Sequence, residues 1–93
     1  MSKIKVVFKS DDTRYKRIEM EVETEKTVEK MILNYLEKIK RVNDMAKFKF
    51  LLRGIALEKL EILEKKIKNV KQIRPMCQIV VREVEAQIGG TKL

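Results

Sequence analysis

The stretch Lys47-Phe48-Lys49-Phe50-Leu51-Leu52-Arg53 alternates between apolar side chains and a second set that is mainly basic. A period of two is typical of a strand with one buried face. We expect Phe48, Phe50 and Leu52 to face the core, and Lys49, Leu51 and Arg53 to face away from it. Two of the three phenylalanines of the chain lie here, so this strand should anchor the core. Gly54 ends it, at a turn that needs positive φ.

The N-terminal residues predict a hairpin. From Lys3 to Lys9, the side chains of Ile4, Val6 and Phe8 fall on one face, and Lys3, Lys5, Val7 and Lys9 fall on the other. A polar turn cluster at residues 10–13 precedes a return strand over Tyr15–Val22, in which Ile18, Met20 and Val22 point inward. The regular alternation of this second strand predicts a solvent-exposed outer face and a position at the sheet edge.

Helical spacing follows the hairpin. Thr24 or Thr27 is the expected N-cap. The apolar stripe comprises Val28, Met31, Ile32, Tyr35, Leu36 and Ile39. Between residues 55 and 76 the pattern predicts one short helix and then a loop that ends at Pro75. The apolar positions with helical spacing there are Leu57, Leu60, Leu63, Ile67 and Val70.

The last predicted strand is Gln78–Arg82, with Ile79 and Val81 facing in and Val80 facing out. Its centre is apolar on both sides, as is Val6-Val7-Phe8 in the first strand. Such runs are typical of central strands. A right-handed crossover through the helix would make these two strands parallel neighbours. The expected strand order is therefore second, first, last, third, with the helix across one face.

The charge is uneven along the chain, whose 93 residues suffice for one small domain. Residues 1–46 carry 11 basic and 9 acidic side chains, and residues 47–93 carry 11 basic and 5 acidic, which gives the net charge of +8. The most basic block comprises Lys65, Lys66, Lys68, Lys71 and Arg74. Such an excess favours an acidic protein partner or nucleic acid, and charge alone does not choose between them.

Several chemistries lack the residues that they need. The chain has no histidine and a single cysteine, Cys77, so neither a histidine-assisted nucleophile nor a zinc site is expected. No glycine pattern for binding phosphates or dinucleotides is present. We therefore expect no enzymatic activity, no metal and no cofactor. The apolar runs are too short for a membrane span or a signal peptide, which, with the lone cysteine, favours the cytosol or nucleus.

The order hairpin, helix, strand, short helix, strand resembles the β-grasp plan of ubiquitin-like modifiers, and SUMO most closely. Phe48–Leu57 is similar to the strand of that family that is followed by a glycine and a leucine. Val28, Met31 and Tyr35 match the spacing of its helix, and Gln87-Ile88-Gly89-Gly90 is similar to the SUMO terminus. The resemblance implies an α+β ubiquitin-like domain over residues 1–84 and a flexible tail over residues 85–93.

The resemblance also implies a function. A processing protease would remove residues 91–93, and activating and conjugating enzymes would then join the carboxylate of Gly90 to lysines of target proteins through an isopeptide bond. Gly89 and Gly90 would be the residues that these enzymes read, in a protein expected to be monomeric. The chain would be the substrate of this chemistry and would supply no catalytic group.

Two other readings compete with conjugation. In one, the chain is a non-covalent interaction module that docks an acidic protein, using Lys16, Arg17 and the basic block Lys65–Arg74. A partner peptide could also add to the free edge of the second strand. In the other, the basic block binds RNA, which we rank last because no aromatic side chain is expected beside it for base stacking.

A partner-binding patch is expected under both protein-level hypotheses. With the predicted strand order, Val7, Val80 and Leu51 lie on three adjacent strands and point away from the helix. Basic side chains frame them, namely Lys5, Lys9, Lys49, Arg53 and Arg82. An exposed apolar patch with a charged rim is typical of a protein-binding site.

Overall fold

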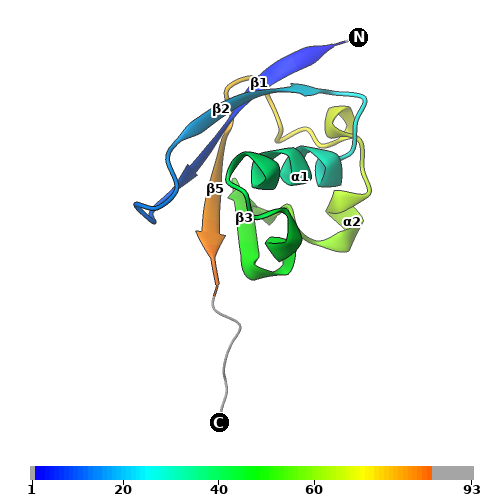
Figure 1. Ribbon diagram of the computed structural model, residues 1–93. Helices are drawn as coiled ribbons and strands as arrows, with labels where there is room; N and C mark the ends of the chain where they lie inside the picture. The colour runs from blue at the N-terminus through cyan, green and yellow to red at the C-terminus, as the bar shows by residue number, and fades with distance from the viewer. Residues whose placement is uncertain (1, 85–93) are drawn as a thin grey trace.

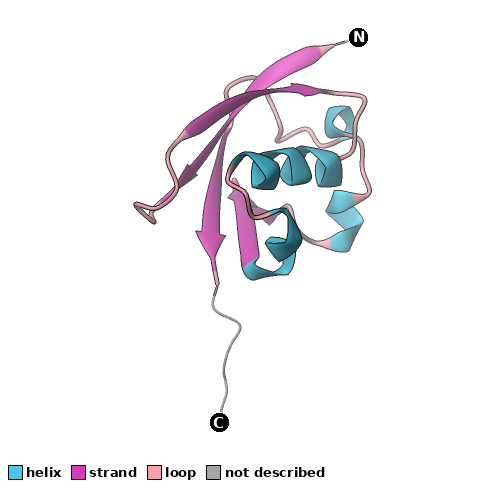
Figure 2. Ribbon diagram, in the orientation of Figure 1, coloured by secondary structure: helices cyan, strands magenta, loops and turns pink. Residues whose placement is uncertain are grey.

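The computed structural model describes residues 2–84, and the expected tail, residues 85–93, lies outside this range. Two pairs of strands are each followed by a pair of helices, and a single strand ends the described chain (Figures 1 and 2). They are β1 (Lys3–Ser10), β2 (Ile18–Glu23), α1 (Val28–Lys38), the 3₁₀ helix η1 (Val42–Lys47), β3 (Phe48–Leu52), β4 (Ile55–Ala56), α2 (Leu60–Leu63), the 3₁₀ helix η2 (Ile67–Asn69) and β5 (Gln78–Glu83). Helix α1 covers one face of the sheet (Figure 1).

The sheet has the order β2-β1-β5-β3-β4. The predicted order of the four main strands is confirmed, and β1 and β5 are parallel, with Phe8 opposite Ile79. The two-residue strand β4 was not predicted. It pairs with β3 through a tight turn in which both Arg53 (φ 50°) and Gly54 (φ 83°) are left-handed. Two consecutive positive φ angles are the geometry of a type I′ hairpin, whose twist matches that of the strands.

The structure decides between the two predicted N-caps of helix α1, Thr24 and Thr27. The hydroxyl of Thr27 accepts a hydrogen bond from the backbone N–H of Lys30 at 3.2 Å, so Thr27, and not Thr24, is the N-cap. The predicted stripe lies against the sheet: Val28, Met31, Ile32, Tyr35 and Leu36 are all buried. Ile39, the last member of the stripe, is partly buried at the C-cap.

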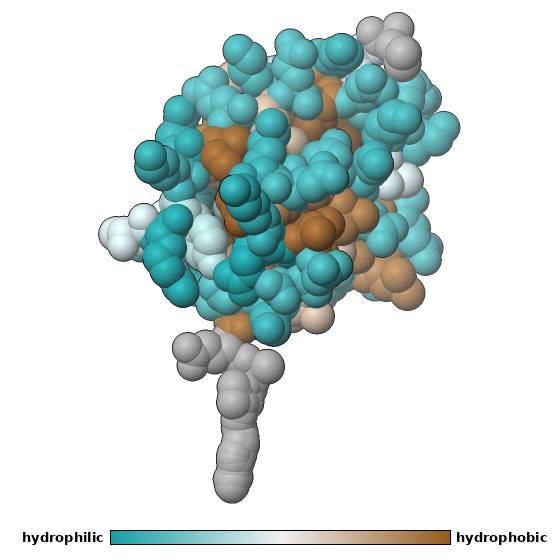
Figure 3. Space-filling view, in the orientation of Figure 1, coloured by the Kyte–Doolittle hydropathy of each residue, from teal (hydrophilic) through white to brown (hydrophobic). Residues whose placement is uncertain are grey.

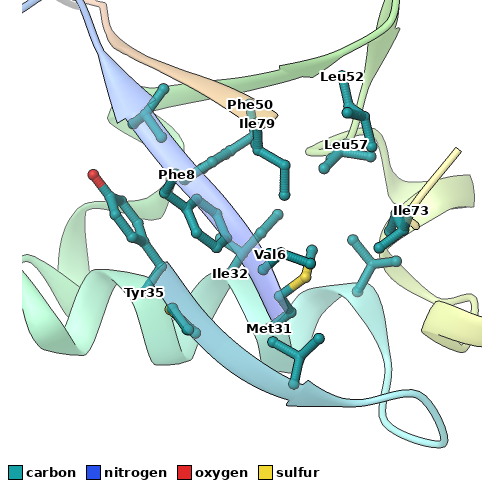
Figure 4. Packing of buried hydrophobic residues seen from close by; sticks show 14 of the residues in the cluster. Val6, Phe8, Met31, Ile32, Tyr35, Phe50, Leu52, Leu57, Ile73 and Ile79 are labelled. Carbon is teal, nitrogen blue, oxygen red and sulfur yellow. The ribbon is translucent and has the colours of Figure 1, made fainter. Parts of the chain in front are cut away.

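Aromatic rings join helix α1 to strands β1 and β3 on the core side of the sheet (Figure 4). The ring of Phe8 stacks on that of Tyr35 with 4.3 Å between centroids, and Phe50 meets both rings edge-on. All three side chains are at most 1% exposed. Burial also raises the pKa of the Tyr35 phenol to about 12, so this ring stays neutral. The predicted role of Phe50 as a core anchor is confirmed.

The segment from residue 55 to residue 76 differs from the prediction of one short helix. It folds as α2 and, separately, η2, and Leu60 is 70% exposed although its spacing predicted an inward position. Tertiary hydrogen bonds explain the break. The carbonyl of Lys65 accepts from the N–H of Val28, and the N–H of Ile67 donates to the carbonyl of Lys26. These bonds hold the chain extended against the start of α1, so local helical propensity is overridden.

We expect Phe50→Ala to lower the free energy of unfolding by about 3–5 kcal/mol, because it leaves a cavity beneath α1. Urea denaturation monitored by circular dichroism measures this change. Leu60→Ala is the matched control, since its side chain is largely exposed and should change stability by less than about 0.5 kcal/mol. Similar stabilities of the two variants would show that the faces of β3 are reversed.

Candidate functional site

The outer face of the sheet, which points away from α1, presents two of the three predicted apolar residues. Leu51 on β3 lies directly opposite Val80 on β5, and Val80 lies beside Lys9 on β1. Both apolar side chains are half-buried. Lys49 and Arg82 oppose each other in the next row of the same face and are exposed. The structure therefore brings Leu51 and Val80 together with Lys9, Lys49 and Arg82, as the sequence predicted.

Val7 does not belong to an exposed patch, and this part of the prediction is wrong. Its side chain is 0% exposed, although it lies outside the main core cluster. Val7 pairs with Glu19 on β2 and with Gln78 on β5, and Lys5 and Lys9 precede and follow it on the same face. The long stems of these neighbours cover a short valine. Accessible apolar surface on this face therefore lies on β5, on β3 and at Ala56 of β4, which pairs with Leu51 and is half-buried.

Charge on the outer face divides by strand. The edge strand β2 presents glutamates, of which Glu21 and Glu23 stand opposite Lys5 and Lys3 of β1. On β5 and β3 the charged side chains of this face are basic, with Arg82 beside Lys49. Arg82 has only a long, exposed contact of 3.7 Å with Asp11. An exposed pair of this kind contributes little, so most of this basic charge is available to a partner.

A second concave surface lies between the edge strand and the helix. The cavity has a volume of about 210 Å³, and β2 contributes its residues Glu21–Glu23 to it. Helix α1 contributes Lys30, Met31 and Asn34. Lys3 and Lys26 add positive charge at the rim. In the described part of the chain β2 pairs only with β1, so the outer edge of β2 faces solvent beside this groove. The predicted edge position of β2 is thus confirmed.

The predicted basic block does not act as one surface. Lys66 and Lys68 both contact the carboxylate of Glu25, at 3.7 and 3.1 Å. These contacts lower the pKa of Glu25, and the hydrogen bond from Lys68 contributes most. Arg74 lies elsewhere, in a hollow with Arg53. Lys65 and Lys71 are exposed. Lys16 and Arg17 precede β2, and Arg17 pairs with Glu19 at 2.8 Å.

A polar cluster at the end of β5 was not predicted from the sequence. Arg41 donates through Nη2 to Oε2 of Glu83 at 2.7 Å and through Nη1 to the hydroxyl of Tyr15 at 2.6 Å. That hydroxyl donates in turn to Oε1 of Glu83 at 2.6 Å. We call these three residues, Tyr15, Arg41 and Glu83, the β5-end cluster. They tie the hairpin loop and the segment after α1 to the last residue of β5.

The β5-end cluster is partly shielded from water. The side chains of Arg41 and Glu83 are 26% and 17% exposed. The guanidinium of Arg41 also lies over the ring of Phe48, 5.2 Å from its centroid. The hydrogen bonds from Arg41 and then from Tyr15 lower the pKa of Glu83. The pKa of Tyr15 is raised, by burial first and then by Glu83. Glu83 is therefore ionised and Tyr15 protonated at neutral pH.

The remaining candidates show no further chemistry. Cys77 is half-buried against the core, and burial raises the pKa of its thiol. Residues 2–84 contain no group of three acidic, cysteine or histidine side chains placed to hold a metal ion. No helix in this range is long and apolar enough to cross a membrane. Gly89 and Gly90, the predicted conjugation residues, lie outside the described range.

Comparisons with known proteins identify the fold. No protein-family model matches the chain, and no curated protein matches it. One similar solved structure is described as molecular mimicry of SUMO that promotes DNA repair (TM-score 0.70, 13% identity, 88% of this chain and 92% of that chain). Another is a ubiquitin-like domain from Arabidopsis thaliana (TM-score 0.69, 18% identity, 96% and 85%). A third is a de novo design based on ubiquitin (TM-score 0.66, 12% identity, 95% and 94%). The chain therefore has the ubiquitin-like β-grasp fold, of class α+β.

The β5-end cluster generates a stability prediction. Glu83→Gln should lower the free energy of unfolding at pH 7 by about 1–2 kcal/mol, because a neutral amide replaces a carboxylate that accepts charge-assisted hydrogen bonds. The folded state lowers the pKa of Glu83 from its usual value of 4.5. Its stabilising contribution is therefore complete above pH 4.5 and is lost as the pH falls through the lower folded pKa. Urea denaturation from pH 7 to acid should show a shallower loss of stability in the variant.

Glu19→Gln is the matched control, because Glu19 pairs with Arg17 on the exposed edge strand. It should cost less than about 0.5 kcal/mol. If Glu83→Gln were no more destabilising than Glu19→Gln, the β5-end cluster would have no structural importance.

Proposed function

We propose that this chain is a ubiquitin-like protein modifier that is conjugated to target lysines through Gly90, after a protease removes residues 91–93. The observation that carries the proposal is that Gly89-Gly90 follow a ubiquitin-like domain in the sequence. Strand β5 ends at Glu83, and Gly90 is the seventh residue after it. A fully extended segment of this length spans at most about 25 Å. That reach would carry the Gly90 carboxylate away from the domain and into the active site of another enzyme.

In this function the chain is a substrate. An activating enzyme would adenylate the Gly90 carboxylate and pass it to a cysteine as a thioester, and a conjugating enzyme would deliver it to a lysine amine. Small residues suit a narrow channel, because glycine has no Cβ and lets backbone approach closely. The described domain would supply recognition surfaces for these enzymes, and the β5-end cluster would hold the start of the tail.

Gly90→Ala tests conjugation. Tagged wild-type chain and the variant would be incubated with ATP in extract of the source cells. We expect wild type to form reductant-sensitive thioesters and reductant-resistant adducts, and the variant to form at least tenfold less of both, because a Cβ at this position obstructs the channel. Trypsin cuts after Arg82 and finds no further lysine or arginine before Gly90. Each modified target lysine should therefore carry the eight-residue remnant Glu83–Gly90, which mass spectrometry detects.

A deletion of residues 91–93 serves as the control, since it should be charged without prior proteolysis. Equal adduct formation by wild type and Gly90→Ala, or no remnant on any lysine, would contradict conjugation through Gly90. Unchanged circular dichroism of the variant excludes misfolding as the cause of any loss.

A second candidate is a non-covalent interaction module, and the outer face of the sheet favours it. Leu51 and Val80 form a half-buried apolar pair beside Lys9, Lys49 and Arg82, which suits an acidic partner with an apolar anchor. The exposed edge of β2 with its lysine-rimmed groove could receive an added peptide strand. One of the similar structures is described as mimicry of SUMO, so a domain of this fold can act by resemblance to a modifier.

Leu51→Ala tests the outer face under either function. Partner affinity should fall by about 1–3 kcal/mol, because the apolar centre of an interface supplies most of the binding energy. Lys49→Glu should mainly slow association at low salt, because rim charges steer encounter. Binding is measured by surface plasmon resonance with the enzyme or target identified through the Glu83–Gly90 remnant, or with a co-purifying protein.

Leu60→Ala provides the matched control for this surface. Leu60 is 70% exposed on α2. Several apolar areas interrupt the mainly hydrophilic surface of the domain in this view (Figure 3). This substitution should leave affinity unchanged. If Leu51→Ala bound as tightly as wild type, or if Leu60→Ala lost as much affinity, the outer face would not be the binding site.

A further inference from the structure

The turn between β3 and β4 and the loop before β5 border an open hollow of about 420 Å³. Its lining residues are Leu52, Arg53, Gln72, Arg74, Pro75, Met76, Cys77 and Gln78. None of them is acidic, and the chain has no acidic residue from position 65 to position 82. We call this feature the arginine hollow.

The two arginines of the hollow differ from the other arginines of the chain. The chain contains six, and the four outside the hollow, Arg14, Arg17, Arg41 and Arg82, all contact carboxylates. Neither Arg53 nor Arg74 makes an ion pair or a side-chain hydrogen bond with residues 2–84, and both are exposed. Within the same range, the amides of Gln72 and Gln78 also make no side-chain hydrogen bond. The hollow therefore brings together two guanidinium groups and two side-chain amides whose donors make no hydrogen bond within residues 2–84.

The backbone around the hollow is held in an unfavourable conformation at two positions. Three non-glycine residues of the described chain have positive φ, and two of them, Arg53 (φ 50°) and Met76 (φ 64°), line the hollow. Arg53 occupies a type I′ turn position that usually carries asparagine, aspartate or glycine. Met76 follows Pro75 in a turn closed by a 3.0 Å hydrogen bond from the N–H of Cys77 to the carbonyl of Arg74. This position, too, usually carries glycine or asparagine.

Each left-handed residue with a side chain costs about 1 kcal/mol. Both turns nevertheless carry long side chains that line the same hollow. Local strain of this kind is a feature of binding sites, where it positions side chains for a ligand. Met76 is 47% exposed, so it offers apolar surface beside the two guanidinium groups.

We propose that the arginine hollow is a binding site for an acidic peptide segment of a partner protein, in which Arg53 and Arg74 bind its carboxylates. Guanidinium groups bind carboxylates through two parallel hydrogen bonds, and the glutamine amides can donate to the peptide backbone or to a second carboxylate. This site is distinct from the Gly-Gly tail and from the groove between β2 and α1, so it stands whether or not the chain is conjugated.

A peptide suits the site better than a free anion. The hollow is open, and its lining includes the exposed apolar residues Pro75 and Met76, which can pack against aliphatic stems of glutamate side chains. It also adjoins the outer face of the sheet, because Arg53 directly follows β3 and Gln78 begins β5. A segment lying along that basic face would therefore place an acidic side chain in the hollow.

The test is a titration of the isotopically labelled full chain, followed by amide chemical shifts. The probe is a capped peptide of three consecutive glutamates flanked by alanines, and its glutamine counterpart is the neutral control. We expect the glutamate peptide to shift the amides of Arg53, Gly54, Gln72, Arg74 and Met76–Gln78, and the glutamine peptide to shift none. Arg53→Gln and Arg74→Gln should each weaken binding about tenfold, because each removes charge-assisted hydrogen bonds.

Lys38→Gln is the matched control, since it removes the same charge from the end of α1. It should leave the affinity unchanged. If Lys38→Gln weakened binding as much as the arginine variants, the attraction would be non-specific and the site would be wrong. The same would follow if Arg53→Gln and Arg74→Gln each bound the peptide as tightly as wild type. A third arm uses inorganic phosphate. If phosphate bound the same residues and the peptide did not, the hollow would be a free-anion site and the peptide assignment would be wrong.

Discussion

The structure depends on strand β1, whose centre is buried on both faces of the sheet. Val6, Val7 and Phe8 are each 0% exposed. Val6 and Phe8 enter the core, where the ring of Phe8 stacks on Tyr35 of α1 and meets Phe50 of β3. Strand β1 pairs with β2 on one side and with β5 on the other, so it connects every major element. Because both of its faces are closed, the apolar side chains of the outer face that a partner could still meet lie on β5, β3 and β4.

The parts of this fold that repeat a simple period could be predicted from the sequence. Alternation identified β1, β2, β3 and β5, and helical spacing identified the buried stripe of α1. The burial of Val7 could not be predicted, since it depends on the length of side chains that adjoin it across two other strands. The break between α2 and η2 depends on hydrogen bonds from Val28 and Ile67 to residues distant in sequence. The β5-end cluster was equally hidden, because Arg41 lies 26 residues from Tyr15 and 42 from Glu83.

The net charge of +8 is a poor guide to what a partner would meet. In the second half of the chain, where the excess lies, Lys66 and Lys68 share Glu25. Arg41 belongs to a structural cluster and contributes little to the outer surface. The basic groups that remain unpaired within residues 2–84 include Lys49 on the outer face and Arg53 and Arg74 in the arginine hollow. In the hollow, each guanidinium group can form two parallel hydrogen bonds with one carboxylate, so its contacts with a partner would be directional.

The two candidate functions place different demands on the end of β5. An interaction module needs Glu83 only to join the hairpin loop to the rest of the domain. A modifier needs a fixed point from which its tail leaves, because a defined exit raises the effective concentration of the terminal carboxylate at an enzyme bound to the domain. The β5-end cluster supplies such a point, since Arg41 and Tyr15 hold the last strand residue from two other elements. If the chain is conjugated as proposed, loosening this anchor should reduce transfer from a domain-bound enzyme, whereas an interaction at the proposed surface of Leu51 and Val80 should be unaffected.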